Sequence, residues 1–172
     1  TATLASKNPT SIMKTETGYK LTIGINGLAD GSEKLTIDLA SDAVFDGNEN
    51  VANASQSNNV LSLREKTPPT IVSTTLSEDN IKAVVTMSEP VFKASNGTGA
   101  LQTTDFSLAL TGGSATLQNS TPTAISVDGN KYTLTISYNG VANGTETLTI
   151  TPVANNIFDA MGNVAATAQS NN

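Results

Sequence analysis

Apolar and polar residues alternate in several short segments of this chain. In residues 19–25, tyrosine, leucine and isoleucine occupy every second position, and residues 132–136 repeat that alternation. Residues 33–39 and 146–151 place leucine and isoleucine in the same way. Alternation over about five to eight residues is typical of a β-strand with one buried face. The same reasoning predicts further strands at 60–63, 71–76, 81–87, 106–110 and 115–117.

Asn-Gly and Asp-Gly dipeptides separate these segments. Asparagine, aspartate and glycine adopt the positive φ angles of tight turns at low cost, so each dipeptide marks a reversal of the chain. The most clearly marked hairpin joins a strand at 130–137 to a strand at 145–151 through the sequence NGVANG. Good helix formers are sparse, so the pattern predicts an all-β fold of antiparallel strands.

The same succession of strands and turns occurs twice, at a constant offset of 113 residues. Residues 1–59 align with residues 114–172 without a gap, and 27 of the 59 pairs are identical. Tyr19 matches Tyr132, and Phe45 matches Phe158. An internal repeat of this length is typical of a modular array.

A charged segment ending in two prolines, REKTPP at 64–69, interrupts the strand pattern. Consecutive prolines form a stiff, extended connector. We therefore expect a first domain over 1–66, a second over 67–172 and a joint at 64–69. Residues 60–63 then form the last strand of the first domain. On this reading the first domain is the C-terminal half of a repeat, and the second lacks its last strand within this chain.

Four stretches of the chain carry recognisable motifs: TPPTIVSTTLS (67–77), SEPV (88–91), DFSLAL (105–110) and NGTETLTITPVANNIFDAMGNVA (143–165). They resemble the immunoglobulin-like tandem repeats of large bacterial surface proteins, such as swimming-motility repeats and the modules of giant adhesins. The resemblance implies tandem antiparallel immunoglobulin-like β-sandwiches, the first of them incomplete. It also implies a secreted protein on the bacterial cell surface.

Composition removes several classes of function. The net charge is −6, and the nine basic residues are scattered, so the chain is not expected to bind nucleic acid. No apolar run approaches the length of a membrane span, so membrane insertion is not expected either. Histidine and cysteine are absent, which removes the usual nucleophilic triads and zinc sites. We expect the chain not to be an enzyme.

One loop has the spacing of a calcium site. Asp46, Asn48 and Asn50 place side-chain oxygens at alternate positions, as a compact loop around a hard cation requires. The matching loop keeps Asp159 and Asn163 but has a methionine in place of Asn48. The shared residues also suit a turn that an aspartate closes. Calcium is thus a candidate ligand, and a structural turn is the alternative.

Aromatic residues at alternating or repeated positions are predicted to anchor the cores, whereas Tyr138 at a hairpin end is predicted to be exposed. The core set comprises Tyr19, Tyr132, Phe45, Phe158, Phe92 and Phe106.

The expected function is that of an extracellular structural or adhesive repeat of a bacterial surface protein or filament. Open sheet edges invite strands from elsewhere, so we expect self-association or contact with neighbouring repeats by strand complementation between chains. The alternative is a calcium-dependent adhesin or a carbohydrate-binding module, with a host-surface or glycan ligand.

Overall fold

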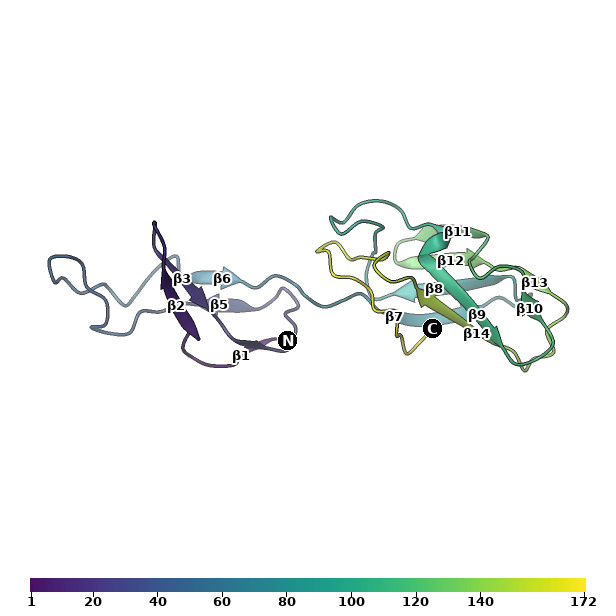
Figure 1. The fold of residues 1–172 in the computed structure, drawn as a ribbon, viewed down its shortest axis with the longest axis horizontal. Coiled ribbons are helices and arrows are strands. Elements are labelled where there is room, and N and C mark those ends of the chain that lie inside the picture. The colour runs from purple at the N-terminus through teal and green to yellow at the C-terminus, as the bar shows by residue number, and fades with distance from the viewer. The chain divides into compact units, whose positions relative to one another are not determined.

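The computed structural model describes all residues from 1 to 172, and its regular structure is β throughout apart from one 3-10 turn at Thr103–Asp105. The chain divides into two compact units, Thr1–Thr67 (unit 1) and Pro68–Asn172 (unit 2). Figure 1 shows the strands of each unit. The division follows Thr67, inside the segment 64–69 where the sequence predicts a joint. None of its elements is a helix of the length and apolar character that a membrane span requires.

Unit 2 contains two main antiparallel sheets. The larger sheet has the order β11-β12-β8-β7, and the smaller one pairs β14 with β9. A short pair, β10 with β13, lies beside them. The bounds are β7 Ile71–Leu76, β8 Lys82–Met87, β9 Phe106–Thr111, β10 Thr116–Leu117, β11 Ala124–Asp128, β12 Lys131–Thr135, β13 Tyr138–Asn139 and β14 Thr147–Pro152.

Both sheets of unit 2 contribute to one core. Alternate residues of β8 and β12, such as Val85 and Leu134, are fully buried in the same cluster as Phe106 of β9 and Ile150 of β14. The period-2 pattern of each strand therefore directs one face toward the other sheet. Unit 2 is a sandwich-like arrangement of two antiparallel sheets.

Unit 1 contains three separate strand pairs: β1 with β4, β2 with β3 and β5 with β6. Its end is held by the carbonyl of Ala29, which accepts the backbone N–H of Lys66 at 2.8 Å. The bounds are β1 Thr3–Leu4, β2 Ser11–Lys14, β3 Tyr19–Thr22, β4 Ile25–Asn26, β5 Lys34–Thr36 and β6 Val60–Ser62.

The sequence repeat is also a repeat of strand register. Thr3 lies opposite Asn26, as Thr116 lies opposite Asn139 at the 113-residue offset. The pairing of β2 with β3 is repeated in the same register by β11 with β12. These matching residues of the two copies therefore form the same two strand pairs.

One predicted hairpin is wrong. The strands predicted at 130–137 and 145–151 do not pair, because β12 lies between β11 and β8 whereas β14 pairs with β9. The tight turn after Asp128 joins β11 to β12, and the NGVANG sequence carries the chain from one sheet to the other. The strand predicted at 71–76 is present with the same bounds.

The side chain of Glu146 accepts hydrogen bonds from two loops at one end of unit 2. Its carboxylate accepts backbone N–H groups from Ser114 at 2.9 Å and from Asn143 at 3.0 Å, among others. Hydrogen bonds that favour the ionised form lower the pKa of Glu146 to about 2. Glu33 occupies the matching position in unit 1 and accepts the N–H of Ala2 at 2.6 Å, which also lowers its pKa.

Replacing Glu146 by glutamine is expected to remove a pH-dependent part of the stability of unit 2. A carboxylate with a lowered folded pKa stabilises the fold above its unfolded pKa of about 4.3, and this contribution is lost as the pH falls toward 2. The melting temperatures of the wild type and Glu146→Gln should therefore differ at pH 6 and converge near pH 2. The exposed Glu78 gives the matched control, Glu78→Gln. An equal pH response of both variants would contradict the assignment.

Candidate functional site

The most unusual surface of this protein is an apolar face of unit 1. Tyr19 is 69% exposed although its counterpart Tyr132 is 2% exposed, and Val44 is 42% exposed although its counterpart Ile157 is fully buried. We call six of the residues whose counterparts belong to or contact the core of unit 2 the open face. They are Ile12, Tyr19, Leu21, Ile23, Ile37 and Val44.

The prediction that Tyr19 and Phe45 anchor a core is therefore wrong, since Phe45 is also exposed. The prediction is confirmed for Tyr132 and Phe106, which are buried with ring centroids 6.3 Å apart. The sequence around the tyrosines is nearly the same in both copies. What differs is the presence of strands that cover them.

In unit 2 these covering strands come from residues 68–113, which we call the covering segment. The hydroxyl of Tyr132 accepts the N–H of Val91 and donates to its carbonyl, both at 3.2 Å. Phe92 and Phe158 exchange two backbone hydrogen bonds of 2.7 and 2.9 Å. The covering segment also supplies β7, β8 and β9 to the two sheets. Unit 1 contains no equivalent of it.

Two strand edges of unit 1 are left without a partner strand for the same reason. β12 pairs with both β11 and β8, but its counterpart β3 pairs only with β2. β14 pairs with β9, but its counterpart β5 pairs with β6 instead. β6 does not occupy the edge of β5 that corresponds to the β9 edge of β14. On the β6 side of β5 the N–H of Ile37 donates to the carbonyl of Asn59, and in unit 2 the N–H of Ile150 donates to the carbonyl of the matching Asn172. Unpaired edges with an apolar face attract further strands.

The predicted calcium loop is held by its own hydrogen bonds. One oxygen of Asp46 accepts the backbone N–H groups of Asn48 and Asn50 at 2.8 and 2.9 Å, and the other accepts the side-chain amide of Asn50 at 2.9 Å. These bonds lower the pKa of Asp46. Asp159 closes the matching loop in the same way, with Asn163 as its side-chain donor. The bonds are those of a turn, and the structure contains no group of three or more acidic side chains that could hold a metal ion.

Calcium at Asp46, Asn48 and Asn50 stays a prediction, which thermal unfolding can test. If an ion binds there, EDTA should lower the melting temperature of unit 1, because a ligand that binds only the folded state stabilises it. The Asp46→Ala variant should lose this sensitivity, and Asp159→Ala serves as the control in the other copy. An identical melt of the wild type with and without EDTA would exclude the ion.

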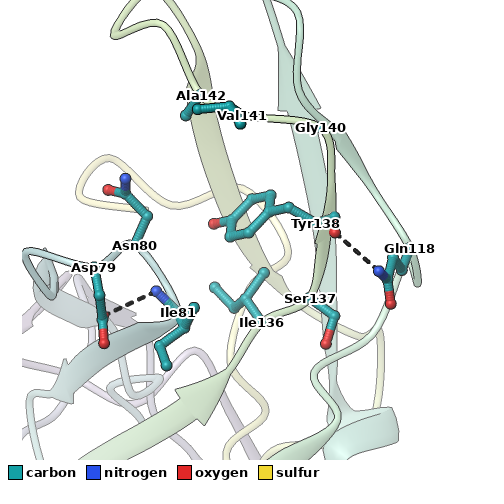
Figure 2. A pocket seen from close by; sticks show the side chains of 10 residues that line it. All are labelled: Asp79, Asn80, Ile81, Gln118, Ile136, Ser137, Tyr138, Gly140, Val141 and Ala142. Atoms are coloured by element: carbon teal, nitrogen blue, oxygen red, sulfur yellow. Dashed lines mark hydrogen bonds between the residues drawn. The ribbon is translucent and has the colours of Figure 1, made fainter.

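Unit 2 also has an open groove of about 460 Å³ beside Tyr138. Figure 2 shows the Tyr138 ring directed across this groove toward Asn80. Tyr138 was predicted to be exposed but is half-buried, and its burial raises the pKa of its hydroxyl. Two polar groups of the lining are already used: Asp79 accepts the N–H of Ile81 at 3.2 Å, and the Gln118 amide donates to the Tyr138 carbonyl at 2.9 Å. Glycan binding stays a prediction.

Sequence reasoning missed a buried ionic cluster in unit 2. Asp105 is fully buried and pairs with Lys93, whose side chain is 36% exposed. Its second oxygen accepts the N–H of Gln102 at 2.8 Å, and the side-chain amide of Asn156 donates to the first at 3.2 Å. The cluster joins the covering segment to the loop after β14. Asn156 lies 51 residues from Asp105 in the sequence, so no local pattern reveals the whole cluster.

No family model, curated protein or solved structure matches this chain.

Proposed function

We propose that this chain is a structural repeat module of an extracellular bacterial surface protein or filament, built from immunoglobulin-like sandwiches. The observation that supports this proposal is the recurrence of the same hairpins in the same register at a 113-residue offset. Repetition of a structural unit without a repeated set of reactive side chains suits a protein whose task is to span distance.

In unit 2, hydrogen bonds join β7 to residues 169–171 in a geometry suited to bear tension. The N–H of Ile71, at the start of β7, bonds the side chain of Gln169 at 2.9 Å, and the hydroxyl of Thr74 bonds the carbonyl of Asn171 at 2.9 Å. Residue numbers rise together in both segments, so they run parallel. A pull applied in opposite directions to residues 68 and 172 therefore slides the two segments past each other and loads their bonds together. That geometry resists force better than peeling apart one bond at a time.

Strand addition is the proposed means by which the modules associate. The free edges of β3 and β5, together with the open face, provide both the backbone groups and the apolar surface that an added strand needs. This association is the adhesive part of the proposed role.

Single-molecule pulling on the full chain tests the load-bearing role. Unit 2 should unfold in one step and lengthen the chain by roughly 350 Å, since residues 68–172 extend by about 3.4 Å each. Pulling the same unit between residue 68 and Asn130, in the turn between β11 and β12, should rupture it at a lower force. Gradual extension without a step, or equal forces in the two geometries, would overturn the proposed role.

A further inference from the structure

We propose that unit 1 is completed by a polypeptide segment of the same kind as the covering segment, joined to it through the main chain of Thr1. This inference rests on the proposed repeat array and names the partner of the open face of unit 1. The pulling experiment on unit 2 does not depend on unit 1, so either proposal can fail alone.

The open face retains the chemistry of a covered one. Four of its residues, Tyr19, Leu21, Ile23 and Ile37, are identical to their buried counterparts in unit 2. Val44 replaces Ile157 by another branched aliphatic residue. Leu21, Ile23 and Ile37 line one hollow of unit 1, and contiguous apolar side chains on a surface mark an interaction site more often than a solvated one. A surface evolved for water would carry polar residues at these positions.

Unit 2 defines the register of the missing strands. Tyr132 and Leu134 lie opposite Val85 and Ala83 of β8, so Tyr19 and Leu21 of unit 1 would face the equivalents of those two residues. On the second edge, Ile150 lies opposite Leu108 of β9, so Ile37 would face the equivalent of Leu108. The partner must therefore alternate small or branched apolar residues in two strands.

The Tyr19 hydroxyl adds a polar requirement. In unit 2 the hydroxyl of Tyr132 satisfies both backbone groups of the buried Val91. A partner of unit 1 would present an extended residue at the position of Val91, whose N–H and C=O would be paired by Tyr19 in the same way. The partner therefore needs a backbone position that can pair with the Tyr19 hydroxyl, as well as the alternating apolar residues.

The position of Thr1 favours a covalent connection. The N–H of Ser114 donates to Glu146 at 2.9 Å, and the amine of Thr1 lies 3.8 Å from the matching oxygen of Glu33. In unit 2 only Gly112 and Gly113 separate β9 from Ser114. A segment joined to Thr1 would therefore reach β5 through an equally short turn. Direct linkage also gives a high effective concentration.

A second copy of this chain is a poor source of the segment. Its own covering segment supplies Val85, Met87 and Phe106 to the core of its unit 2, so donating that segment would open that core. A segment that is joined to Thr1 and completes no other core has no such conflict.

The test extends the full chain by a second copy of residues 68–113 placed before Thr1. The added copy carries Lys82→Thr, because Lys20 would otherwise lie diagonal to a like charge across the new strand pair. Hydrogen exchange is then measured at Tyr19–Thr22 and Lys34–Thr36. Completion should slow exchange there by at least about 100-fold, toward the rates of β12 and β14.

Two further experiments test whether the apolar residues of the added segment are required and whether the segment must be linked to the chain. An extension with Val85→Asp and Leu108→Asp in the added copy alone should leave β3 and β5 exchanging as in the unextended chain. Residues 68–113 supplied as a separate polypeptide should protect them less than the linked copy does. Unchanged exchange in the linked chain, equal protection by the aspartate variant, or stronger protection by the separate segment would each overturn the proposal.

Discussion

Replacing Leu134 by alanine is expected to lower the free energy of unfolding of unit 2 by about 2–5 kcal/mol. The Leu134 side chain is fully buried in the cluster that β8, β9, β12 and β14 enclose. Truncation removes apolar contacts and leaves a cavity, since the two sheets cannot close fully around the smaller side chain. Urea denaturation followed by hydrogen exchange in β12 measures the loss for this unit.

Leu21 provides the matched control, because it occupies the same position in β3. It is only half-buried, so Leu21→Ala should cost less than Leu134→Ala by a clear margin. Equal losses for the two variants would mean that the open face of unit 1 is covered in solution. That outcome would contradict the exposure described for the unextended chain.

Replacing Lys93 by methionine is expected to destabilise unit 2 by about 3 kcal/mol. The change leaves the fully buried Asp105 carboxylate without its cation, although the backbone N–H of Gln102 still donates to it. The value lies at the low end for a buried pair because the Lys93 side chain is 36% exposed and water screens the interaction. Thermal or urea unfolding at pH 7 measures it.

A second variant separates charge from packing. Lys93→Met combined with Asp105→Asn removes both charges and keeps one acceptor oxygen for Gln102, so it should recover part of the lost stability. If the double variant is as unstable as Lys93→Met alone, the loss comes from packing of the lysine stem and not from the buried charge.

The sequence predicted the strands well because period-2 alternation is a local property. It failed to predict how those strands pair. The NGVANG loop has the turn chemistry of a hairpin, yet it connects strands of different sheets. Turn residues mark where the chain reverses. Which strands then pair with each other depends on the apolar faces that meet in the core. The strand at Ala124–Asp128 was missed, and its Val127 is exposed.

Burial and side-chain networks were harder to predict for a related reason. Tyr19 and Tyr132 share a local sequence pattern, but only Tyr132 is covered, because its partners Val91 and Phe106 lie in the covering segment. The cluster around Asp105 likewise depends on Asn156, which is distant in sequence. The turn at Asp46 was foreseen as an alternative to calcium, since an Asx turn is local.

The matching registers of β3 and β12 also bear on how the chain finds its fold. In the unfolded chain β8 can meet either strand, since Val84 is separated by similar lengths from Thr133 and from the matching Lys20. Closing the longer of these two loops costs only about 0.2 kcal/mol more. Chain entropy therefore barely distinguishes the two partners. Whether β8 pairs with β3 or with β12 therefore depends on the positions where the two copies differ. Lys20 of β3 would lie diagonal to the like charge of Lys82, which favours pairing with β12.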